Sequence, residues 1–468
     1  MSLSEHWKSV ACLTISGCSL SVFPVELTRL PLLENLYLDN NKLTQLPSEL
    51  GELTTLKVLT VDHNMLASVP AELRQCVGLV ELSLEHNRLV RPLLDFRAMS
   101  ELCTLKLFGN PIEFLPEILP LHKLRHLSFA NIRIKGNDSS LKSVDVEIKT
   151  ENSSSYFNAS RHRLSAFLSL IFRSSSCHHP LLASAMAKIM QDDGDRVVVG
   201  KDENVVQQLI SMMSSDNPHV IEQASYALSV LAADVSVAMQ LMKSDIMQPI
   251  ESLLMRSTMG QEELKLVLQV VVNLAFTSDD VARKILTKDV LRSLEVLCAH
   301  RDTEVQRLAL FAVGNLAFCL ENRHTLVASE SLRELLLRLM GTSDLRVYKA
   351  AARALAILGE NENLRRASRA RPIAKQGLRI LAMDGGGMRG LATVQMLKQI
   401  EQGTGKRIHE MFDLICGTST GGMLAVALGI KQMTLDECEE IYKNLGKRVF
   451  AEPVNEAGSN SQKLISEL

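Results

Sequence analysis

Apolar positions recur with a constant step along the first third of the chain. Four copies of the pattern apolar-x-apolar-x-x-Asn-x-apolar follow one another 23 residues apart. Their asparagines are Asn41, Asn64, Asn87 and Asn110. An earlier copy has Cys18 at the asparagine position, and a drifting copy lies near residues 124–129. The alternation predicts one short strand per copy, and the fixed step predicts that these strands stack around a shared apolar core.

Such an array is typical of a leucine-rich repeat solenoid of about six units, which we assign to residues 9–135. Each asparagine side chain is expected to turn inward and satisfy backbone groups along the stack. Ordinary leucine-rich helices do not keep a step of 23 residues, so the pattern argues against them. Residues 136–160 lose the alternation and fill with Asn, Asp and Ser, which predicts a linker.

From residue 161 to residue 366 the apolar pattern becomes helical. Leucine motifs recur at steps of 43, 42 and 42 residues, each after a stretch rich in alanine or valine that allows close helix packing. The leucines are Leu231, Leu274, Leu316 and Leu358. This pattern resembles armadillo repeats, which form an α-solenoid. The basic segment 367–376 that follows lacks apolar periodicity and is expected to be a linker to the last domain, residues 377–468.

Composition narrows the possible partners. A length of 468 residues predicts about three domains. The 51 basic and 53 acidic residues give a net charge of -2, so no global field favours nucleic acid as a partner. Nine scattered cysteines without a Cys-x-x-Cys pair indicate reduced thiols in a cytoplasmic compartment. Neither a signal peptide nor an apolar run of roughly 20 residues is present, which predicts a soluble protein with peripheral membrane contact at most.

One cluster raises the question of a metal ion. Cys177, His178 and His179 are consecutive, and three ligands so close in the chain do not easily surround one ion without distant help. The sequence therefore predicts no metal site and no cofactor.

A glycine-rich stretch follows the apolar residues 378–383, which we expect to form a buried strand, and precedes a helix expected over residues 393–400. Glycines at such a junction let backbone N–H groups turn toward one point, where an oxyanion is stabilised. Arg389 is expected to steady the loop. Dinucleotide-binding sites use a similar Gly-x-Gly-x-x-Gly spacing, so this stretch alone does not decide the chemistry. The candidate oxyanion-hole residues are Gly385, Gly386, Gly387, Arg389 and Gly390.

A second motif lies between an expected strand over residues 411–416 and an expected helix over residues 423–428. It is Gly417-Thr418-Ser419-Thr420-Gly421. A serine raised on a tight strand-to-helix turn needs small residues around it, because a Cβ there blocks the turn. Ser419 is therefore the candidate nucleophile, Gly417, Thr418 and Gly421 shape its elbow, and the N–H of Thr420 is a further oxyanion donor.

Together the two motifs resemble the patatin-like phospholipase family over residues 376–452. The order of leucine-rich repeats, armadillo repeats and patatin domain resembles that of a plant member. The resemblance implies an α/β hydrolase domain in which Ser419 forms the acyl-enzyme and residues 385–387 with Arg389 belong to the oxyanion loop. It also implies a Ser-Asp dyad without histidine or metal, and hydrolysis of acyl esters in membrane phospholipids or galactolipids.

The family's aspartate lies in an Asp-Gly-Gly or Asp-Gly-Ala motif downstream of the serine, and no such motif follows Gly421. Asp436 is the sole later aspartate, and it lies between Thr434 and Glu437, whose spacing predicts a capping box at a helix start. His409 has no aspartate partner assignable from the sequence. We therefore expect an incomplete patatin domain, from a truncated gene model or splice product, with negligible activity.

Two alternatives stay open. A non-enzymatic scaffold would bind protein partners on the two solenoids and carry the patatin-like segment as a remnant. A nucleotide-binding protein would need an acidic residue about 20 residues after the glycine loop, and Glu401 or Glu410 would have to serve.

Overall fold

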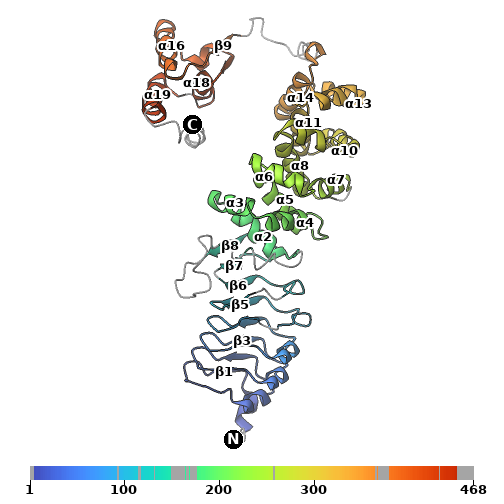
Figure 1. Ribbon diagram of the computed structural model, residues 1–468, viewed down its shortest axis with the longest axis vertical. Helices are drawn as coiled ribbons and strands as arrows, with labels where there is room; N and C mark the ends of the chain where they lie inside the picture. Colours follow the sequence, from blue (N-terminus) through green and yellow to red (C-terminus); the bar gives the residue numbers. More distant parts are fainter. Residues whose placement is uncertain are drawn as a thin grey trace. The chain divides into compact units, whose positions relative to one another are not determined.

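The computed structural model describes residues 5–148, 177–363 and 379–450, apart from 92–93, 114–116, 131, 257–258 and 432, together with Leu164, Leu168 and Arg366. The chain divides into two compact units, Met1–Ser368 and Arg369–Leu468. The first unit contains both repeat arrays, and the second contains the two glycine motifs (Figure 1). The basic segment 367–376 lies outside the described residues.

An eight-stranded sheet runs through the amino-terminal part of the first unit. Its first six strands are parallel, and equivalent leucines stand side by side: Leu36 aligns with Leu13 on one side and with Leu59 on the other. Short 3-10 helices lie on the return path of the repeats. The strands are β1 Cys12–Thr14, β2 Asn35–Tyr37, β3 Val58–Thr60, β4 Glu81–Ser83, β5 Thr104–Phe108 and β6 His126–Ala130. The 3-10 helices are η1 Glu5–Ser9, η2 Val25–Arg29, η3 Ser48–Glu52 and η4 Ala71–Gln75.

The inward asparagines predicted from the repeat pattern are present. Asn64 is 7% exposed, and its Nδ2 donates to the carbonyl of Leu38 in the preceding repeat at 3.0 Å. Its Oδ1 accepts from the backbone N–H of Leu43 at 3.0 Å. Asn87 and Asn110 make the same contacts one repeat further on. These bonds satisfy buried backbone groups that the short strands leave without a ladder partner.

A left-handed residue recurs just after each strand. Gly17, Asn40, His63, His86 and Gly109 have φ between 54° and 72°, and they follow one another at the repeat step. Non-glycine residues seldom adopt this conformation. The turn that leads each repeat away from its strand is therefore imposed by the stack, even where the sequence offers a histidine.

Two antiparallel strands complete the sheet, β7 Ile132–Gly136 and β8 Val144–Ile148. The prediction that residues 136–160 form an aperiodic linker is wrong for residues 144–148, which form β8. Val144 is buried and Val146 packs against the core, while Asp145 and Glu147 point outward. This is strand alternation, which the surrounding Asn and Ser residues obscured. Residues 149–160 lie outside the described part of the chain.

The helical part of the first unit repeats a group of three helices. The third helix of each group is the longest, and α5, α8, α11 and α14 pack on one another in that order. Their motif leucines and alanines are buried, as the 42-residue step predicts. The helices are α2 Pro180–Ile189, α3 Asp193–Gly200, α4 Glu203–Met212, α5 Pro218–Leu231, α6 Val235–Lys243, α7 Met247–Met255, α8 Gln261–Ala275, α9 Asp279–Ile285, α10 Lys288–Cys298, α11 Thr303–Leu316, α12 Leu320–Ala328, α13 Glu330–Leu339 and α14 Leu345–Ile357.

The sheet and the helices are joined through α2, which packs against β7 and β8. His179 precedes α2 and is 1% exposed. Its Nδ1 accepts from the N–H of Leu181, so its Nε2 carries the proton and donates to the carbonyl of Leu121 at 3.0 Å. Burial lowers the pKa of His179 to about 4, which keeps the ring neutral. One histidine therefore caps a helix of the solenoid and bonds to the last parallel repeat.

The second unit is a short parallel sheet with helices around it (Figure 1). Strand β9 Ile380–Met383 pairs with β10 Leu414–Gly417, and the core includes Met383, Val394 and Leu424. Both strands start later than residues 378 and 411, where we expected them, and Met411 instead ends a short helix. The other elements are η5 Gly387–Arg389, α16 Gly390–Thr404, α17 Ile408–Met411, α18 Thr420–Gly429 and α19 Leu435–Phe450.

Candidate active site

Ser419 lies on a sharp turn between β10 and α18. Its backbone has φ 51° and ψ -125°, a conformation that side-chain-bearing residues rarely adopt. A Cβ on Gly417 would overlap the backbone of Gly421, and a Cβ on Gly421 would overlap the carbonyl of Met383. The predicted elbow is therefore built by strand-to-helix geometry that admits only glycine on both sides of the serine.

The glycine loop after β9 lies directly against this elbow. A Cβ on Gly385 would lie 2.7 Å from the Cβ of Ser419 and 3.4 Å from its Oγ. Gly387 has φ 54°, which turns the loop into the short helix η5. The two motifs that stand 34 residues apart in the sequence, taken from Gly385 to Ser419, thus form one site.

Two of the predicted oxyanion donors are engaged by threonine side chains. The N–H of Gly385 donates to Oγ1 of Thr418 at 3.1 Å, and the N–H of Gly386 donates to Oγ1 of Thr420 at 3.2 Å. These bonds tie the loop to the residues on either side of Ser419. They also hold both amides toward the elbow, where a hydroxyl oxygen occupies the acceptor position.

The remaining loop residues have different surroundings. Arg389 is exposed, and its backbone N–H donates to the carbonyl of Gly386 at 3.0 Å. Gly390 is buried against the ring of Tyr442, which leaves no space for a Cβ. The hydroxyl of Tyr442 donates to the carbonyl of Thr420 at 2.6 Å. Tyr442 thereby connects α19 to the glycine loop and to the elbow, a contact that the sequence analysis missed because Tyr442 follows the ordinary apolar spacing of an amphipathic helix.

An ion pair aligns the two strands at their starts. Arg379 donates from Nε and Nη2 to both carboxylate oxygens of Asp413 at 3.1 and 2.9 Å. The guanidinium lowers the pKa of Asp413 to about 2. The pair lies before the first residues of β9 and β10, whereas the glycine motifs lie at the carboxyl ends of the two strands.

The candidate bases from the sequence do not approach the serine through any described contact. Asp436 is bound by Lys398 at 2.5 Å, and its side chain is 90% exposed. The capping box is confirmed, since Glu437 accepts from the N–H of Thr434 at 2.7 Å and donates its own N–H to the Thr434 hydroxyl. His409 lies on α17, before β10.

Local contacts also occupy the two carboxylates that a nucleotide site would need. Glu401 accepts from the N–H of Ile408 at 2.8 Å, and Glu410 accepts from the N–H of Arg407 at 2.9 Å. Both bonds cap the short helix α17, which argues against a ribose contact. Of the cluster considered for a metal, His178 contacts Ser211 and His179 contacts Leu121, and no group of metal-binding side chains occurs within the described residues.

Comparison with known proteins confirms the class of chain that the motifs indicate. Residues 381–466 match the family described as patatin-like phospholipase, and residues 13–89 match leucine-rich repeats. These matches cover the amino-terminal repeats and the second unit, and the structure itself shows the helical solenoid between them, so the multidomain fold class predicted from the sequence is confirmed.

Individual relatives are phospholipases by name. The chain is 69% identical to Phospholipase A I of Arabidopsis thaliana over 466 residues, which are 99% of this chain and 35% of the relative. It is 38% identical to calcium-independent phospholipase A2-gamma of Rattus norvegicus over 167 residues, 35% of this chain and 20% of the relative. The chain thus spans about a third of the length of the plant relative.

Among solved structures, a designed armadillo repeat protein is similar at a TM-score of 0.36 with 20% identity, covering 46% of this chain and 86% of that one. Within the described residues, none of the helices has the length and apolar character that crossing a membrane requires.

Proposed function

We propose that the second unit is the nucleophile-bearing part of a serine lipid acyl hydrolase of the phospholipase A or galactolipase type. The observation that carries this proposal is the contact between Gly385 and Ser419, which places a strained serine beside two backbone N–H donors. A nucleotide-binding loop needs no such serine. The names of the relatives, all phospholipases, support the choice of substrate.

In the proposed reaction the Ser419 Oγ attacks the carbonyl carbon of an acyl ester, and its proton passes to the dyad aspartate. The tetrahedral intermediate bears its charge on the former carbonyl oxygen. The N–H groups of Gly385, Gly386, Gly387 and Thr420 are the proposed donors to that oxygen. In the free site the N–H groups of Gly385 and Gly386 donate to threonine hydroxyls. In the proposed reaction the oxyanion replaces these hydroxyl oxygens as the acceptor. The intermediate then breaks its ester C–O bond, and the lysolipid oxygen takes the proton from the dyad aspartate. Water attacks the acyl-enzyme and gives a proton to the aspartate, and that proton returns to Ser419 Oγ as the fatty acid leaves.

The dyad aspartate is the missing part of this scheme. Asp436, the sole aspartate that follows Ser419, is committed to Lys398 at the start of α19. We therefore propose that residues 1–468 by themselves hydrolyse esters negligibly, since loss of one member of a catalytic unit costs several orders of magnitude in rate.

The proposed substrates are phospholipids or galactolipids, approached by peripheral contact with a membrane. A reducing, cytoplasmic location is supported by the cysteines, because all nine are free thiols in the structure. No cofactor is proposed.

The test measures fatty-acid release from phosphatidylcholine and galactolipid vesicles by residues 1–468 and by their Ser419→Ala variant. Both should show the same background rate. A product extended through in-frame codons beyond 468 that encode Asp-Gly-Gly or Asp-Gly-Ala should show turnover that Ser419→Ala abolishes. Robust Ser419-dependent turnover by residues 1–468 would refute the proposed need for a later aspartate. An inactive extended product would count against the hydrolase itself.

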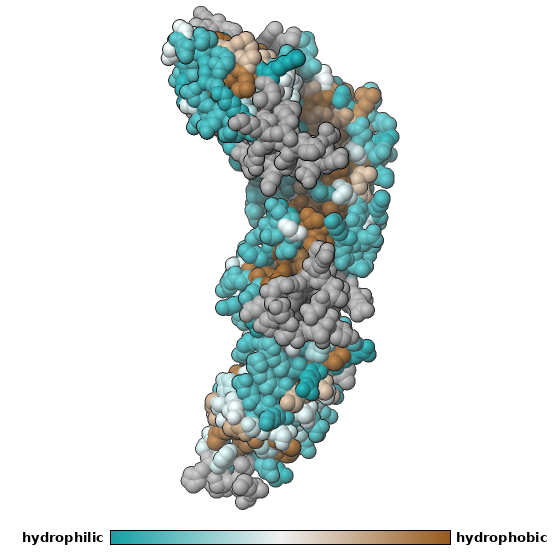
Figure 2. Space-filling model, turned by 60° about the vertical axis from the view of Figure 1, so that its left-hand side comes forward, coloured by the Kyte–Doolittle hydropathy of each residue, from teal (hydrophilic) through white to brown (hydrophobic). Residues whose placement is uncertain are grey.

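A second function, protein scaffolding by the first unit, is favoured by exposed aromatic side chains on the helical solenoid. Phe276 and Phe318 follow α8 and α11, are 69% and 48% exposed, and meet edge to face at 6.2 Å between ring centroids. Figure 2 shows apolar side chains at the surface of the helical solenoid. Pull-down with residues 1–366 should recover protein partners that a Phe276→Ser, Phe318→Ser double variant loses, whereas equal recovery by both would contradict docking at this surface.

A further inference from the structure

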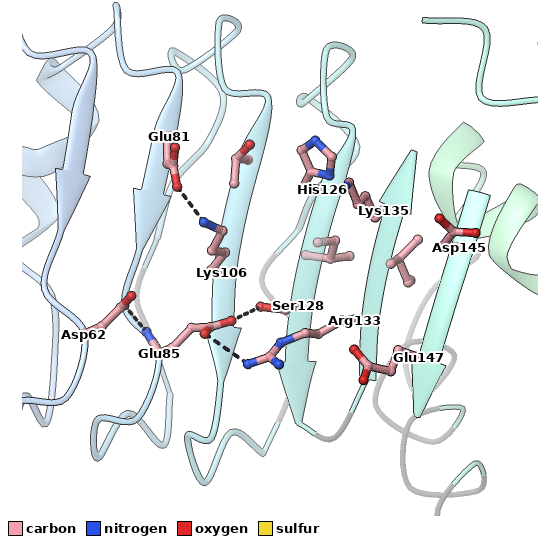
Figure 3. Close-up of a pocket in the computed structure, with 13 residues that line it drawn as sticks. Asp62, Glu81, Glu85, Lys106, His126, Ser128, Arg133, Lys135, Asp145 and Glu147 are labelled. Atoms are coloured by element: carbon pink, nitrogen blue, oxygen red, sulfur yellow. Dashed lines mark hydrogen bonds and ion pairs between the residues drawn. The ribbon is translucent and has the colours of Figure 1, made fainter. Parts of the chain in front are cut away.

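Within the described residues of the first unit, three arginines lie over phenylalanine rings. For two of them, Arg133 and Arg307, the guanidinium carbon is 4.1 and 5.1 Å from the ring centroid. Both also hold a carboxylate: Arg133 donates to Glu85 at 3.2 Å, as Figure 3 shows, and Arg307 donates to Glu304 at 2.6 Å. A ring covers only a face of the guanidinium, and the N–H groups at its edge still need acceptors. A ring and a carboxylate together therefore complete the surroundings of each of these two arginines.

The third arginine, Arg353 on α14, has the rings without the carboxylate. Its guanidinium carbon is 5.1 Å from the ring centroid of Phe311 and 5.5 Å from that of Phe318. Its Nη2 donates to Oδ1 of Asn315 at 2.7 Å, while the buried Nη1 has no hydrogen-bond partner among the described residues. No ion pair in the described part of the chain includes Arg353, and burial alone lowers its pKa. This partly buried cation lacks the anion that usually accompanies one.

A glycine in α11 makes room for this guanidinium. A Cβ on Gly314 would overlap Nη1 of Arg353. Gly314 lies in the interior of α11, where glycine costs about 1 kcal/mol relative to alanine. The helix thus carries a destabilising residue at a position that lets the arginine lie against its backbone, which indicates a requirement for the guanidinium at this place.

The missing carboxylate does not come from the chain that follows α14. Residues 363–383 contain no Asp or Glu. Glu360 lies between α14 and this segment, but its carboxylate accepts from Nδ2 of Asn363 and does not act on the pKa of Arg353. An acceptor for Arg353 is therefore expected from outside the first unit.

The charges that remain uncommitted beside Arg353 are positive. Glu304 and Asp344 are each paired with an arginine, at 2.6 and 3.3 Å. Lys349 lies one turn before Arg353 on α14, is exposed, and belongs to no ion pair in the described residues. Charge complementarity consequently favours an acidic partner.

Exposed aromatic surface borders the arginine. Phe318, whose ring Arg353 contacts, also meets Phe276, and both rings are exposed. We propose that this surface binds a protein segment in which an acidic side chain stands next to an aromatic one. The carboxylate accepts from the edge of the Arg353 guanidinium, and the aromatic ring packs on Phe276 and Phe318. The inference rests on the scaffolding function proposed for the first unit and adds the chemistry of the partner.

A protein segment fits this surface better than a membrane does. Arg353 is partly buried between two rings, so a projecting side chain reaches it, whereas phosphates in the plane of a bilayer do not. An anionic bilayer would also be held against Glu304 on α11 and Asp344 at the start of α14.

Fluorescence anisotropy of two labelled peptides with the full chain tests the proposal. One peptide alternates Asp and Phe residues, and the other has Asn in place of each Asp. The acidic peptide should bind about tenfold more tightly, and Arg353→Gln should remove this advantage, the loss of one charge-assisted bond, while leaving the Asn peptide within about twofold. Lys201→Gln removes the same charge from an exposed residue after α3, in the first group of helices, and should leave both peptides unchanged.

Gly314→Ala is a second variant that keeps every charge. It displaces the guanidinium, and because alanine favours a helix the variant stays folded. It should weaken the acidic peptide as Arg353→Gln does. Unchanged binding in both variants would overturn the proposal, as would equal weakening by Lys201→Gln and Arg353→Gln, since the effect would then be one of net charge. Tighter Arg353-dependent binding to vesicles containing phosphatidylserine than to the acidic peptide would overturn the assignment of a protein partner.

Failure of the scaffolding function would look different. If the two peptides bind alike while the Phe276→Ser, Phe318→Ser variant still loses its pull-down partners, the scaffold stands and the acidic partner is wrong. If the pull-down recovers no partner but the acidic peptide requires Arg353, the binding site stands without the scaffold. Ser419 lies in the other unit, so Ser419→Ala should bind both peptides as wild type does, whatever the outcome for the hydrolase.

Discussion

Gly385 and Ser419 touch each other across the two strands of the second unit: a methyl group at position 385 would lie 2.7 Å from Cβ of the serine and 3.0 Å from the carbonyl oxygen of Thr418. The Thr418 carbonyl belongs to the backbone, and Ser419 is held at φ 51°, so neither group can move away without further strain. The glycine loop and the elbow are therefore fitted to one another, and either motif loses its geometry if the other shifts.

We expect Gly385→Ala to destabilise the second unit by about 3 kcal/mol, at the upper end of what forced overpacking costs. Hydrogen exchange monitored by mass spectrometry would report this on peptides from residues 379–450 without interference from the first unit.

The matched control is Gly403→Ala on α16, where an added Cβ meets nothing within 4 Å. In a helix this change should be neutral or stabilise by about 0.5 to 1 kcal/mol. Equal protection in wild type and Gly385→Ala would contradict the contact between loop and elbow.

Tyr442 is the second element that fixes the elbow. Tyr442→Phe removes the hydrogen bond to the Thr420 carbonyl and keeps the ring against Gly390, so we expect a loss of about 1 kcal/mol. Tyr442→Ala also removes the ring and should cost about 3 kcal/mol or more. Exchange of the amides that begin α18 should rise in both variants, in that order. The same exchange in Tyr442→Phe and Tyr442→Ala would show that the ring does not support the elbow.

The sequence predicted those parts of the structure that repeat or that need glycine. Asparagines at a fixed step determine a parallel stack, and the glycines around Ser419 determine a strained turn, because in both cases local geometry leaves few alternatives. β8 was missed because its alternation is only five residues long and lies among Asn and Ser residues.

Contacts between distant residues were beyond prediction from one sequence. Neither the bond from Tyr442 to Thr420 nor the bond from His179 to Leu121 leaves a local pattern, since each joins residues more than 20 positions apart. The threonines beside Ser419 are an intermediate case. Their place in the elbow was predicted, but their bonds to the amides of Gly385 and Gly386 appear only once the two strands are paired.

The asparagine stack offers a comparison within the chain itself. Asn64→Ala should leave the Leu43 N–H buried without its partner and remove one of the two hydrogen bonds that the Leu38 carbonyl accepts, at a cost of about 2 kcal/mol. Cys18 holds the equivalent position in the first repeat but is exposed, and Cys18→Ala should change stability by less than about 0.5 kcal/mol. Denaturant unfolding followed by the fluorescence of Trp7, the sole tryptophan, measures both. Similar losses in the two variants would mean that the asparagine bonds contribute little.

His179 should make the first unit sensitive to acid. In the folded state burial lowers its pKa from 6.5 to about 4, whereas in the unfolded chain it titrates near its ordinary value. Between these two values the unfolded chain binds the extra proton, so stability falls as pH falls. This contribution to the stability of the first unit, on the order of 3 kcal/mol, is fully present above about pH 6.5 and is lost by about pH 4.

His179→Gln should therefore show a smaller loss of stability than wild type between pH 7 and pH 4, although it is less stable at pH 7 because the bond to Leu121 is disturbed. His324→Gln changes an exposed histidine of α12 and should retain the wild-type pH dependence. Denaturant midpoints at the two pH values decide the matter, and an identical acid loss in wild type and His179→Gln would show that the joint between the two repeat arrays does not depend on a neutral histidine.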